Sequence, residues 1–266
     1  MPGGRGPELT TPHPRESVLR GRCAIVTGAS AGIGLATAIR LAADGADLVV
    51  NARDSTRLEQ AVERIARHGS ARVTGVAGDA AAPEVIAELS AAAERWGGAA
   101  IAVANAGGGL PRGEISEEDA AMLWRTNVWS TQALIEAVGP GMAQRGWGRI
   151  VTVSSVAGRR CSPTSTSTYA AAKAGVIALT RCAAIDLAPH GVTVNSVAPG
   201  VTATDRIVDR LAGMPDDRVA TIGAGIPVGR WAEPDEVAAA VAFLCSPAAG
   251  YITGHTLDVN GGAWMN

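Results

Sequence analysis

Short apolar runs alternate with longer amphipathic stretches from Gly21 to the end of the chain. Apolar runs rich in Val, Ile and Ala are typical of strands buried on both faces of a parallel sheet, and apolar residues at helical spacing indicate the helices that cover it. The expected strands are Cys23–Thr27, Asp47–Asn51, Arg72–Ala77, Ala100–Ala104, Arg149–Ser154, Thr193–Val197 and Thr256–Val259. The expected helices are Gly34–Ala43, Ser55–Arg67, Pro83–Trp96, Ser116–Val138, Thr168–Leu187 and Pro234–Cys245. The pattern predicts an α/β fold, a single doubly wound domain whose seven-stranded parallel sheet carries helices on both faces.

Two segments fall outside this alternation. Residues 1–20 are rich in Pro, Gly and charge and lack the apolar stretch of a secretory signal, so we expect a disordered N-terminal tail before a single domain at residues 21–266. The segment Thr202–Gly229 contains no clear strand and is a candidate lid.

Composition and charge narrow the class of protein. A net charge of -2 and a pI of about 6.1 give no electrostatic reason to expect nucleic acid or an anionic membrane as a partner. No apolar run approaches the roughly 20 residues that a membrane span needs. The four cysteines and four histidines show no metal-ligand spacing, so we expect a reduced cytoplasmic protein without a structural metal.

A glycine-rich turn, Thr27-Gly28-Ala29-Ser30-Ala31-Gly32-Ile33-Gly34, follows the first expected strand and leads into the first helix. Glycines let the backbone approach a pyrophosphate closely, and a helix N-terminus offers unpaired N–H groups and the positive end of its dipole. The alternative is a tight structural turn. Its place between the first strand and the first helix favours dinucleotide binding.

Lys173 is the single lysine among 23 Lys and Arg residues, and it follows one of only two tyrosines, Tyr169, by one helical turn. Residues four apart share a helix face, so the phenol and the ammonium are expected in one cleft. A nearby cation lowers the pKa of a phenol and makes it a usable general acid or base. The alternative is an exposed tyrosine beside a surface lysine.

Several ordered motifs together resemble the short-chain dehydrogenase/reductase family. They are the glycine turn at 27–34, Asn105-Ala106-Gly107 after the fourth strand, Ser154-Ser155 after the fifth, Tyr169-x-x-x-Lys173, and Pro199-Gly200 after the sixth. The resemblance covers residues 21–266 and implies a Rossmann-type domain with a nicotinamide cofactor. Gly229–Pro234, Thr253-Gly254 and Asp258–Gly262 look most like the 3-oxoacyl thioester (acyl-carrier-protein) reductases.

The resemblance implies roles for four catalytic residues. Tyr169 would exchange the proton with the substrate oxygen, and Lys173 would lower the pKa of that phenol and hold the nicotinamide ribose. Ser155 aligns with the family serine that binds the substrate carbonyl, with Ser154 as its structural neighbour. Asn127 matches the asparagine that helps to carry a water chain from Lys173, and asparagine is otherwise unfavourable within a helix.

The resemblance also implies the residues that bind the cofactor. Asp79 would bind the adenine amino group, although an N-cap of the next helix is the alternative, and Thr204 would meet the nicotinamide carboxamide. The other cofactor residues are Gly28, Ser30, Gly32, Ile33, Gly34, Asn105, Ala106, Gly107, Pro199, Gly200 and Thr202, with Tyr169 and Lys173 shared. The chain departs from the family at Ala104, where a second asparagine is common, and at Gly146 and His190, where carrier-protein reductases present basic residues beside the cleft.

The end of the second strand bears on the choice of cofactor. An NAD site usually has an acidic residue there, whereas this strand ends with Ala52 followed by Arg53. Arg53, helped by the Ser30 hydroxyl, suits the 2′-phosphate of NADP(H), which is therefore favoured. If the strand runs further, Asp54 takes the discriminating place and NAD(H) is preferred.

The expected activity is reduction of a ketone to a secondary alcohol, and a 3-oxoacyl thioester is one candidate for that ketone. The alternatives are an NAD(H)-linked dehydrogenase that oxidises a sugar, polyol or steroid-like alcohol, and a dinucleotide-binding regulator without turnover. Relatives commonly assemble through the helices that begin here at Ser116 and Thr168 and through the last strand. Because Trp124, Trp129 and Trp264 lie on those elements, a homotetramer is expected.

Overall fold

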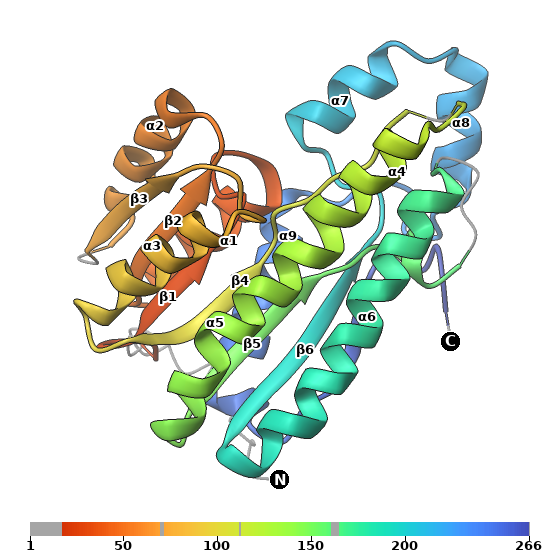
Figure 1. The fold of residues 1–266 in the computed structure, drawn as a ribbon. Helices are drawn as coiled ribbons and strands as arrows, with labels where there is room; N and C mark the ends of the chain where they lie inside the picture. The colour runs from red at the N-terminus through yellow and green to blue at the C-terminus, as the bar shows by residue number, and fades with distance from the viewer. Residues whose placement is uncertain (1–17, 70–71, 112, 161–164, 266) are drawn as a thin grey trace, which may run out of the picture.

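The computed structural model describes residues 18–69, 72–111, 113–160 and 165–265. Its seven strands form one parallel sheet in the order β3-β2-β1-β4-β5-β6-β7 (Figure 1). The strands are β1 (Cys23–Val26), β2 (Asp47–Ala52), β3 (Val73–Ala77), β4 (Ala99–Ala104), β5 (Gly148–Val153), β6 (Val192–Pro199) and β7 (Thr256–Val259). The predicted seven-stranded, doubly wound fold is confirmed.

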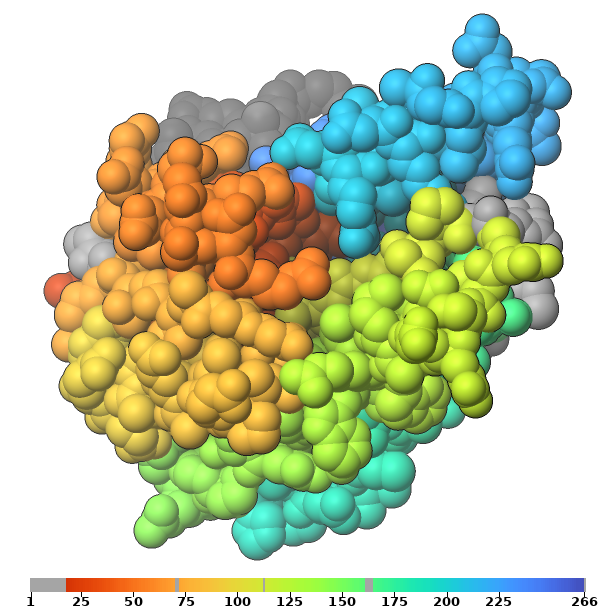
Figure 2. Space-filling model, turned by 45° about the horizontal axis from the view of Figure 1, so that its top comes forward, coloured from red at the N-terminus to blue at the C-terminus, as the bar shows by residue number. Residues whose placement is uncertain are grey.

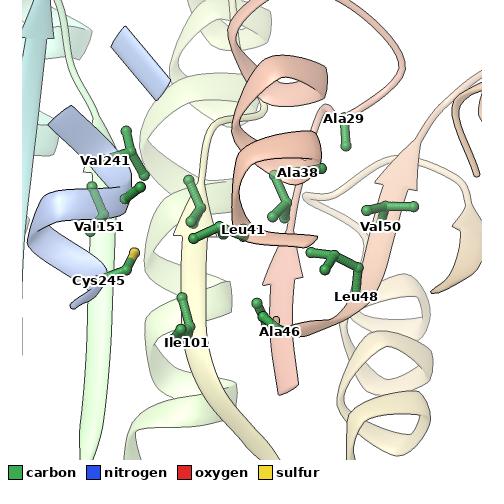
Figure 3. Close-up of a cluster of buried hydrophobic side chains, with 14 of the residues drawn as sticks. Ala29, Ala38, Leu41, Ala46, Leu48, Val50, Ile101, Val151, Val241 and Cys245 are labelled. Atoms are coloured by element: carbon green, nitrogen blue, oxygen red, sulfur yellow. The ribbon is translucent and has the colours of Figure 1, made fainter. Parts of the chain in front are cut away.

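Helices cover both faces of the sheet, which explains why its central strands β1 and β4 are apolar throughout. They are α1 (Gly32–Ala43), α2 (Ser55–Ala66), α3 (Pro83–Glu94), α4 (Glu117–Trp124), α5 (Ser130–Gln144), α6 (Ser167–Leu187), α7 (Asp205–Ala212), α8 (Asp216–Ala224) and α9 (Pro234–Cys245). One core cluster joins the sheet to α1, α2 and α9, and Figure 3 shows Leu41 of α1 and Val241 of α9 within it. A second cluster joins the opposite face to α3, α5 and α6 through Leu89, Leu134 and Ala184.

The order of the strands places the ligand crevice. The chain runs outward from β1 through β2 to β3 and then returns to β4 on the other side of β1. At such a reversal the connections leaving β1 and β4 diverge, and a crevice opens beyond the carboxyl ends of these strands. The glycine turn follows β1 and Asn105 follows β4, so both lie at this crevice.

The expected helix Ser116–Val138 is not one regular helix. Ser116 caps α4 through a reciprocal capping box with Asp119. A π-helical turn, Arg125–Trp129, then separates α4 from α5, and α5 continues to Gln144. A π turn inserts one extra residue into a helix, so the expected span is helical on both sides of the turn but shifts in phase at Arg125–Trp129.

The segment Thr202–Gly229 forms α7 and α8, with no strand of the sheet within it. These helices lie beyond the carboxyl ends of the strands (Figure 1), and Figure 2 shows them standing out from the body of the molecule beside α4. This placement suits a lid over the crevice.

The N-terminal tail expected at residues 1–20 lies outside the described residues as far as residue 17. Leu19 is fully buried, and its backbone N–H donates to the carbonyl oxygen of Asp44 at 3.0 Å. The packed domain therefore begins before Gly21. In the part of the chain that the structure describes, no helix is long and apolar enough to cross a membrane.

Candidate active site

The glycine turn after β1 is held by residues that follow β4. Thr27 Oγ1 accepts hydrogen bonds from the backbone N–H groups of Asn105 (3.1 Å) and Ala106 (3.0 Å). Asn105 Nδ2 donates to the carbonyl oxygens of Thr27 (2.9 Å) and Gly28 (3.0 Å). Gly28 has a φ of 66°, and a Cβ on Gly34 would collide with the carbonyl oxygen of Gly28. Helix α1 can approach the turn this closely only because both residues are glycine.

The N-terminus of α1 suits an anion. Its N-cap, Ala31, makes no side-chain cap, and its first turn contains no acidic residue. The first N–H groups and the helix dipole therefore favour a negatively charged group such as a pyrophosphate. A Cβ on Gly32 would lie 2.8 Å from Cγ2 of Thr204, so the start of the lid packs onto the turn. Ile33 anchors the turn by packing against the core.

Helix α6 places a half-buried Tyr169 beside a buried Lys173. Thr166 caps the helix, with its Oγ1 accepting from the backbone N–H of Tyr169 at 3.2 Å. Lys173 Nζ lies 5.8 Å from the centre of the Tyr169 ring and donates to the carbonyl oxygen of Val153 at 2.7 Å. Lys173 is only 4% exposed, which excludes a surface pair. Burial, and to a smaller extent Arg206, lowers the pKa of Lys173 to about 7.

The phenol of Tyr169 is a weaker acid than an ordinary tyrosine. Burial raises its pKa, because a desolvated phenolate is disfavoured, while Ser155, Arg206 and Arg210 act in the opposite direction with smaller effects. We expected Lys173 to lower this pKa. Instead the opposing effects come from the serine and the two lid arginines, and burial prevails. Tyr169 is therefore a protonated phenol at neutral pH.

The two serines after β5 have different partners. Ser154 is 3% exposed, and its Oγ donates to the carbonyl oxygen of Lys173 at 2.8 Å, which ties β5 to α6. Ser155 Oγ accepts from the backbone N–H of Ala157 at 3.1 Å and is the side-chain hydrogen-bond partner of the Tyr169 phenol. Of the two, Ser155 is the one placed to reach a carbonyl oxygen at the phenol.

Asn127 lies fully buried in the π-helical turn. Its Nδ2 donates to the carbonyl oxygens of Gly108 (3.0 Å) and Leu123 (2.8 Å), and its Oδ1 accepts from the backbone N–H of Gly108 (3.1 Å). A Cβ on Gly107 would lie 2.5 Å from this Oδ1 and 3.4 Å from Lys173 Nζ. Asn127 therefore holds the loop after β4 against the lysine. Its part in a water chain stays a prediction.

Asp79, after β3, has partners that the sequence did not indicate. The N-cap of α3 is Ala82, so the N-cap interpretation of Asp79 is wrong. Asp79 Oδ1 accepts from the backbone N–H of Ala81 at 3.0 Å, and its Oδ2 accepts from Arg125 Nη2 at 3.1 Å. Arg125 thus links the third strand to the π-helical turn. The adenine contact of Asp79 stays a prediction.

The end of β2 lies where the sequence placed it, within one residue. The strand ends at Ala52, and Asp54 caps α2 by accepting from the backbone N–H of Arg57 at 2.9 Å. Arg53 follows the strand with an exposed side chain. Beside Ser30 lies a cavity of about 550 Å³, whose basic residues are Arg57 and Arg64 of α2. Arg53 does not line this cavity, so the two groups of cations occupy different places around the turn.

The segment after β6 closes the other side of the crevice. Pro199 ends the strand, and the backbone N–H of Gly200 donates to the carbonyl oxygen of Val259 at 2.9 Å. Thr202 is 4% exposed, and its Oγ1 donates to the carbonyl oxygen of Gly200 at 3.3 Å. Thr204 is the N-cap residue of α7 and makes no side-chain cap. This segment connects the sheet to the lid.

Two of the departures from the family lie far from the site. Gly146 precedes β5 and His190 precedes β6, at the amino ends of the strands, and Gly191 packs against the carbonyl of Gly146. They therefore lie at the edge of the sheet opposite to Tyr169 within this chain. Ala104 is buried at the end of β4.

The structure brings the predicted residues of the glycine turn, the loop at 105–107, Asn127, Ser155, Tyr169 and Lys173 to one edge of the sheet. Arg206 and Arg210 of α7, which act electrostatically on Tyr169, were not predicted from the sequence. Their spacing of one helical turn in a segment without a strand was the available signal. In the described residues, no cluster of three or more His, Cys, Asp or Glu could hold a metal.

Comparison with known proteins adds the family. Residues 28–263 match the family model described as "Enoyl-(Acyl carrier protein) reductase". The chain is 42% identical over 252 residues to a 3-oxoacyl-[acyl-carrier-protein] reductase of Vibrio cholerae, which covers 93% of this chain and 99% of that protein. It is 40% identical to a cis-4-hydroxycyclohexanecarboxylate dehydrogenase of Sinomonas cyclohexanicum, over 91% of this chain and 96% of the relative. A solved 7α-hydroxysteroid dehydrogenase, in complex with NADH and 7-oxoglycochenodeoxycholic acid, superposes with a TM-score of 0.86 at 32% identity, covering 93% of this chain and 96% of the other.

Proposed function

Because the chain belongs to the short-chain dehydrogenase/reductase family, we propose that it reduces a small-molecule ketone to a secondary alcohol with NADP(H). Membership makes the protein an NAD(P)-dependent oxidoreductase that acts on CH–OH or C=O groups. The substrate, the direction and the choice between the two cofactors are the proposed part.

The residues of the crevice fit a dinucleotide. A Cβ on Gly34 would collide with the carbonyl oxygen of Gly28, so glycine lets α1 begin directly against the turn, and the first turn of α1 has neither a side-chain cap nor an acid to compete with phosphate. We assign the pyrophosphate to Gly28, Gly32 and Gly34 and the nicotinamide ribose to Lys173. When bound, the nicotinamide supplies the hydride.

The chain's own residues then handle the carbonyl oxygen and its proton. Ser155 donates a hydrogen bond to the carbonyl oxygen, and Tyr169 gives its phenolic proton to that oxygen as negative charge develops there. Lys173 holds the ribose and, when protonated, favours the phenolate that is left. Asn127 keeps the loop at Gly108 in place beside them.

One observation carries the proposed direction: Tyr169 is half-buried, desolvation raises the pKa of its phenol, and Ser155 is its side-chain hydrogen-bond partner. A phenol that keeps its proton at neutral pH is prepared to act as an acid, which is what reduction of a ketone requires. Oxidation of an alcohol needs the phenolate, which this burial disfavours.

The test measures loss of the reduced-nicotinamide absorbance with a panel of ketones. Tyr169→Phe should abolish turnover and leave the affinity for cofactor nearly intact, because only the transferable proton is removed. Tyr251→Phe is the matched control, since the only other tyrosine is fully exposed. If Tyr169→Phe keeps more than about a tenth of the wild-type rate, the assignment of the proton donor is wrong.

The preference for NADP(H) is supported at the end of β2. Asp54 is engaged as the cap of α2, and Arg53 stands directly after the strand. Arg53→Ala should raise the KM for NADPH by roughly tenfold or more and leave that for NADH nearly unchanged, as expected for a lost charged hydrogen bond.

Two further variants sharpen this measurement. Arg67→Ala, at the far end of α2, is the control and should leave both KM values unchanged. A larger effect of Arg57→Ala than of Arg53→Ala would place the 2′-phosphate in the cavity beside Ser30 and overturn the role of Arg53. A wild-type preference for NADH would contradict the proposed cofactor itself.

The alternative activity is oxidation of a sugar, polyol or steroid-like alcohol with NAD(H). It is favoured by the hydroxysteroid dehydrogenase whose structure holds NADH and by the relative named as a dehydrogenase of a hydroxy acid. The same assay run in reverse, with NAD and alcohols at neutral pH, separates the two. Faster oxidation than reduction at equal, subsaturating concentrations would favour this alternative.

We propose a homotetramer with twofold axes. Trp124 and Trp129 are 47% and 53% exposed, and Ile185 of α6 is 75% exposed, so large apolar side chains face outward from neighbouring helices. Such residues suit a buried interface. Ile185→Glu should dissociate the assembly in sedimentation experiments, and a wild-type monomer at micromolar concentration would contradict the proposal. A cytoplasmic location stays a prediction.

A further inference from the structure

Helix α7 carries two arginines toward the reacting centre. Its residues Asp205–Ala212 follow directly on Thr204, which packs onto the glycine turn. Arg206 and Arg210 lie one turn apart and therefore share a face of the helix. Both act electrostatically on Tyr169, and the Arg206 guanidinium lies against Gly108 in the loop after β4.

The position of Arg206 follows from two neighbouring glycines. A Cβ on Gly108 would lie 3.2 Å from Cζ and 3.5 Å from Nη2 of Arg206. A Cβ on the next residue, Gly109, would lie 3.2 Å from Cγ and Cδ2 of Tyr169. Consecutive Cα atoms are about 3.8 Å apart. The Arg206 guanidinium and the Tyr169 ring therefore lie against adjacent residues of one loop.

The charged groups that act on Tyr169 and Lys173 are cations, since Arg206 acts on both residues and Arg210 acts on Tyr169. Lys173, Arg206 and Arg210 act on the site, and no carboxylate is among the groups that act on Tyr169 or Lys173. In the described part of the chain, Arg206 forms no ion pair. Cations held together repel one another, and an anion bound among them relieves that repulsion. The exposed guanidinium of Arg206 is open to such a ligand.

We propose that Arg206 binds an anionic group, a carboxylate or a phosphate, of the substrate whose carbonyl lies at Tyr169. The substrate is then an oxo acid, or an oxo compound with a phosphate, whose charge lies a few bonds from the ketone. A guanidinium binds such groups through two parallel N–H donors, which fixes the orientation of the carbonyl as well as its charge. This inference rests on the proposed ketone reduction and names the class of its substrate.

The cofactor's pyrophosphate is a second anion that Arg206 could bind, so the experiment distinguishes it from the anionic group of the substrate. The probe is 4-oxocyclohexanecarboxylate, compared with its uncharged methyl ester. The affinities for acid and ester are measured with saturating NADPH in the Tyr169→Phe background, where turnover cannot interfere. The affinity for NADPH is measured separately, without either ligand. The acid should bind at least tenfold more tightly than the ester. Arg206→Gln should reduce this ratio to below about threefold, a loss of charge-assisted hydrogen bonds.

The acid-to-ester affinity ratio is compared between variants, because removing Arg206 also changes the electrostatic field at Tyr169 for both ligands alike. Arg206→Lys, which keeps the charge without the planar fork, should restore part of the ratio. Arg218→Gln, an exposed arginine of α8 in the same lid, should leave the ratio unchanged. Raised salt should lower the acid-to-ester ratio of the parent, since an exposed cation is screened.

Several outcomes overturn the proposal. Equal affinities of the Tyr169→Phe protein for the acid and the ester overturn it, whatever the Arg206 variants show. An acid-to-ester affinity ratio that is unchanged in Arg206→Gln also overturns it. So does an Arg206→Gln variant in which only NADPH binding is weakened, and that outcome assigns Arg206 to the cofactor's phosphates. If acid and ester differ as expected but the wild-type enzyme oxidises NADPH with neither, ketone reduction fails while the anion site stands.

Discussion

A single methyl group at Gly34 tests whether the close approach of α1 to the glycine turn controls cofactor binding. Gly34 lies in the first turn of α1, where alanine would normally be preferred to glycine by about 0.5–1 kcal/mol. An added Cβ would, however, collide with the carbonyl oxygen of Gly28 and with Nδ2 of Asn105, and would lie 2.9 Å from the carbonyl carbon of Gly28.

The magnitude follows from what must move. Normal contact requires α1 or the turn to shift by about 1 Å, and overpacking of this kind costs about 1–3 kcal/mol. The shift also strains the bonds from Asn105 Nδ2 to Thr27 (2.9 Å) and Gly28 (3.0 Å). Each of these contributes about 0.5–1.5 kcal/mol. After the gain in helix propensity, Gly34→Ala should destabilise the fold by about 1–4 kcal/mol.

Gly34→Ala should weaken NADPH binding by more than its loss of fold stability explains. The first N–H groups of α1 move away from the pyrophosphate, so the affinity for NADPH should fall by about tenfold or more. Gly223→Ala is the matched control. It lies inside α8, where a Cβ would meet only Trp231 at 3.9 Å, so it should be neutral or stabilise by up to about 1 kcal/mol.

Thermal unfolding and a fluorescence titration with NADPH measure the two quantities. The reasoning is refuted if Gly34→Ala binds NADPH as tightly as the wild type and unfolds within about 0.5 kcal/mol of it. A loss of stability without a loss of affinity would show that the turn is a structural one.

Three further predictions concern the residues around Tyr169. Lys173→Arg should lower kcat/KM by about a hundredfold or more, because a buried site that seats one ammonium 2.7 Å from the Val153 carbonyl oxygen cannot seat a guanidinium; near-normal kinetics would contradict this. Asn127→Ala should lower the free energy of unfolding by about 2–4 kcal/mol, since a fully buried side chain loses its bonds to Gly108 and Leu123; denaturant unfolding measures it, and a change below about 0.5 kcal/mol would show that the loop does not depend on Asn127. The pKa of Lys173, lowered from 10.5 to about 7, means that the unfolded chain binds an extra proton between these values. Stability should therefore rise with pH across that window, and Lys173→Met should lose this part of the rise; an unchanged slope in the variant would contradict the lowered pKa.

Local patterns in the sequence determined the fold class and the central pair of the site. Strands covered on both faces are rich in apolar residues, so the seven runs were visible without any contact information. The glycine turn was visible because its backbone demands glycine at fixed places, and Tyr169 and Lys173 share a face because the helix repeat sets their spacing. Each of these features depends on residues close together in the chain.

The features that needed the tertiary structure depend on segments that are distant in the chain. The sign of the pKa shift of Tyr169 was missed because burial by neighbouring segments outweighs the nearby cations. Asp79 meets Arg125 across 46 residues, and Arg206 reaches the loop at Gly108 from the lid. Gly146 and His190 lie at the opposite edge of the sheet because parallel strands bring all their amino ends together. No periodicity encodes these distances, because they are set by how the lid, the π-helical turn and the sheet pack against one another.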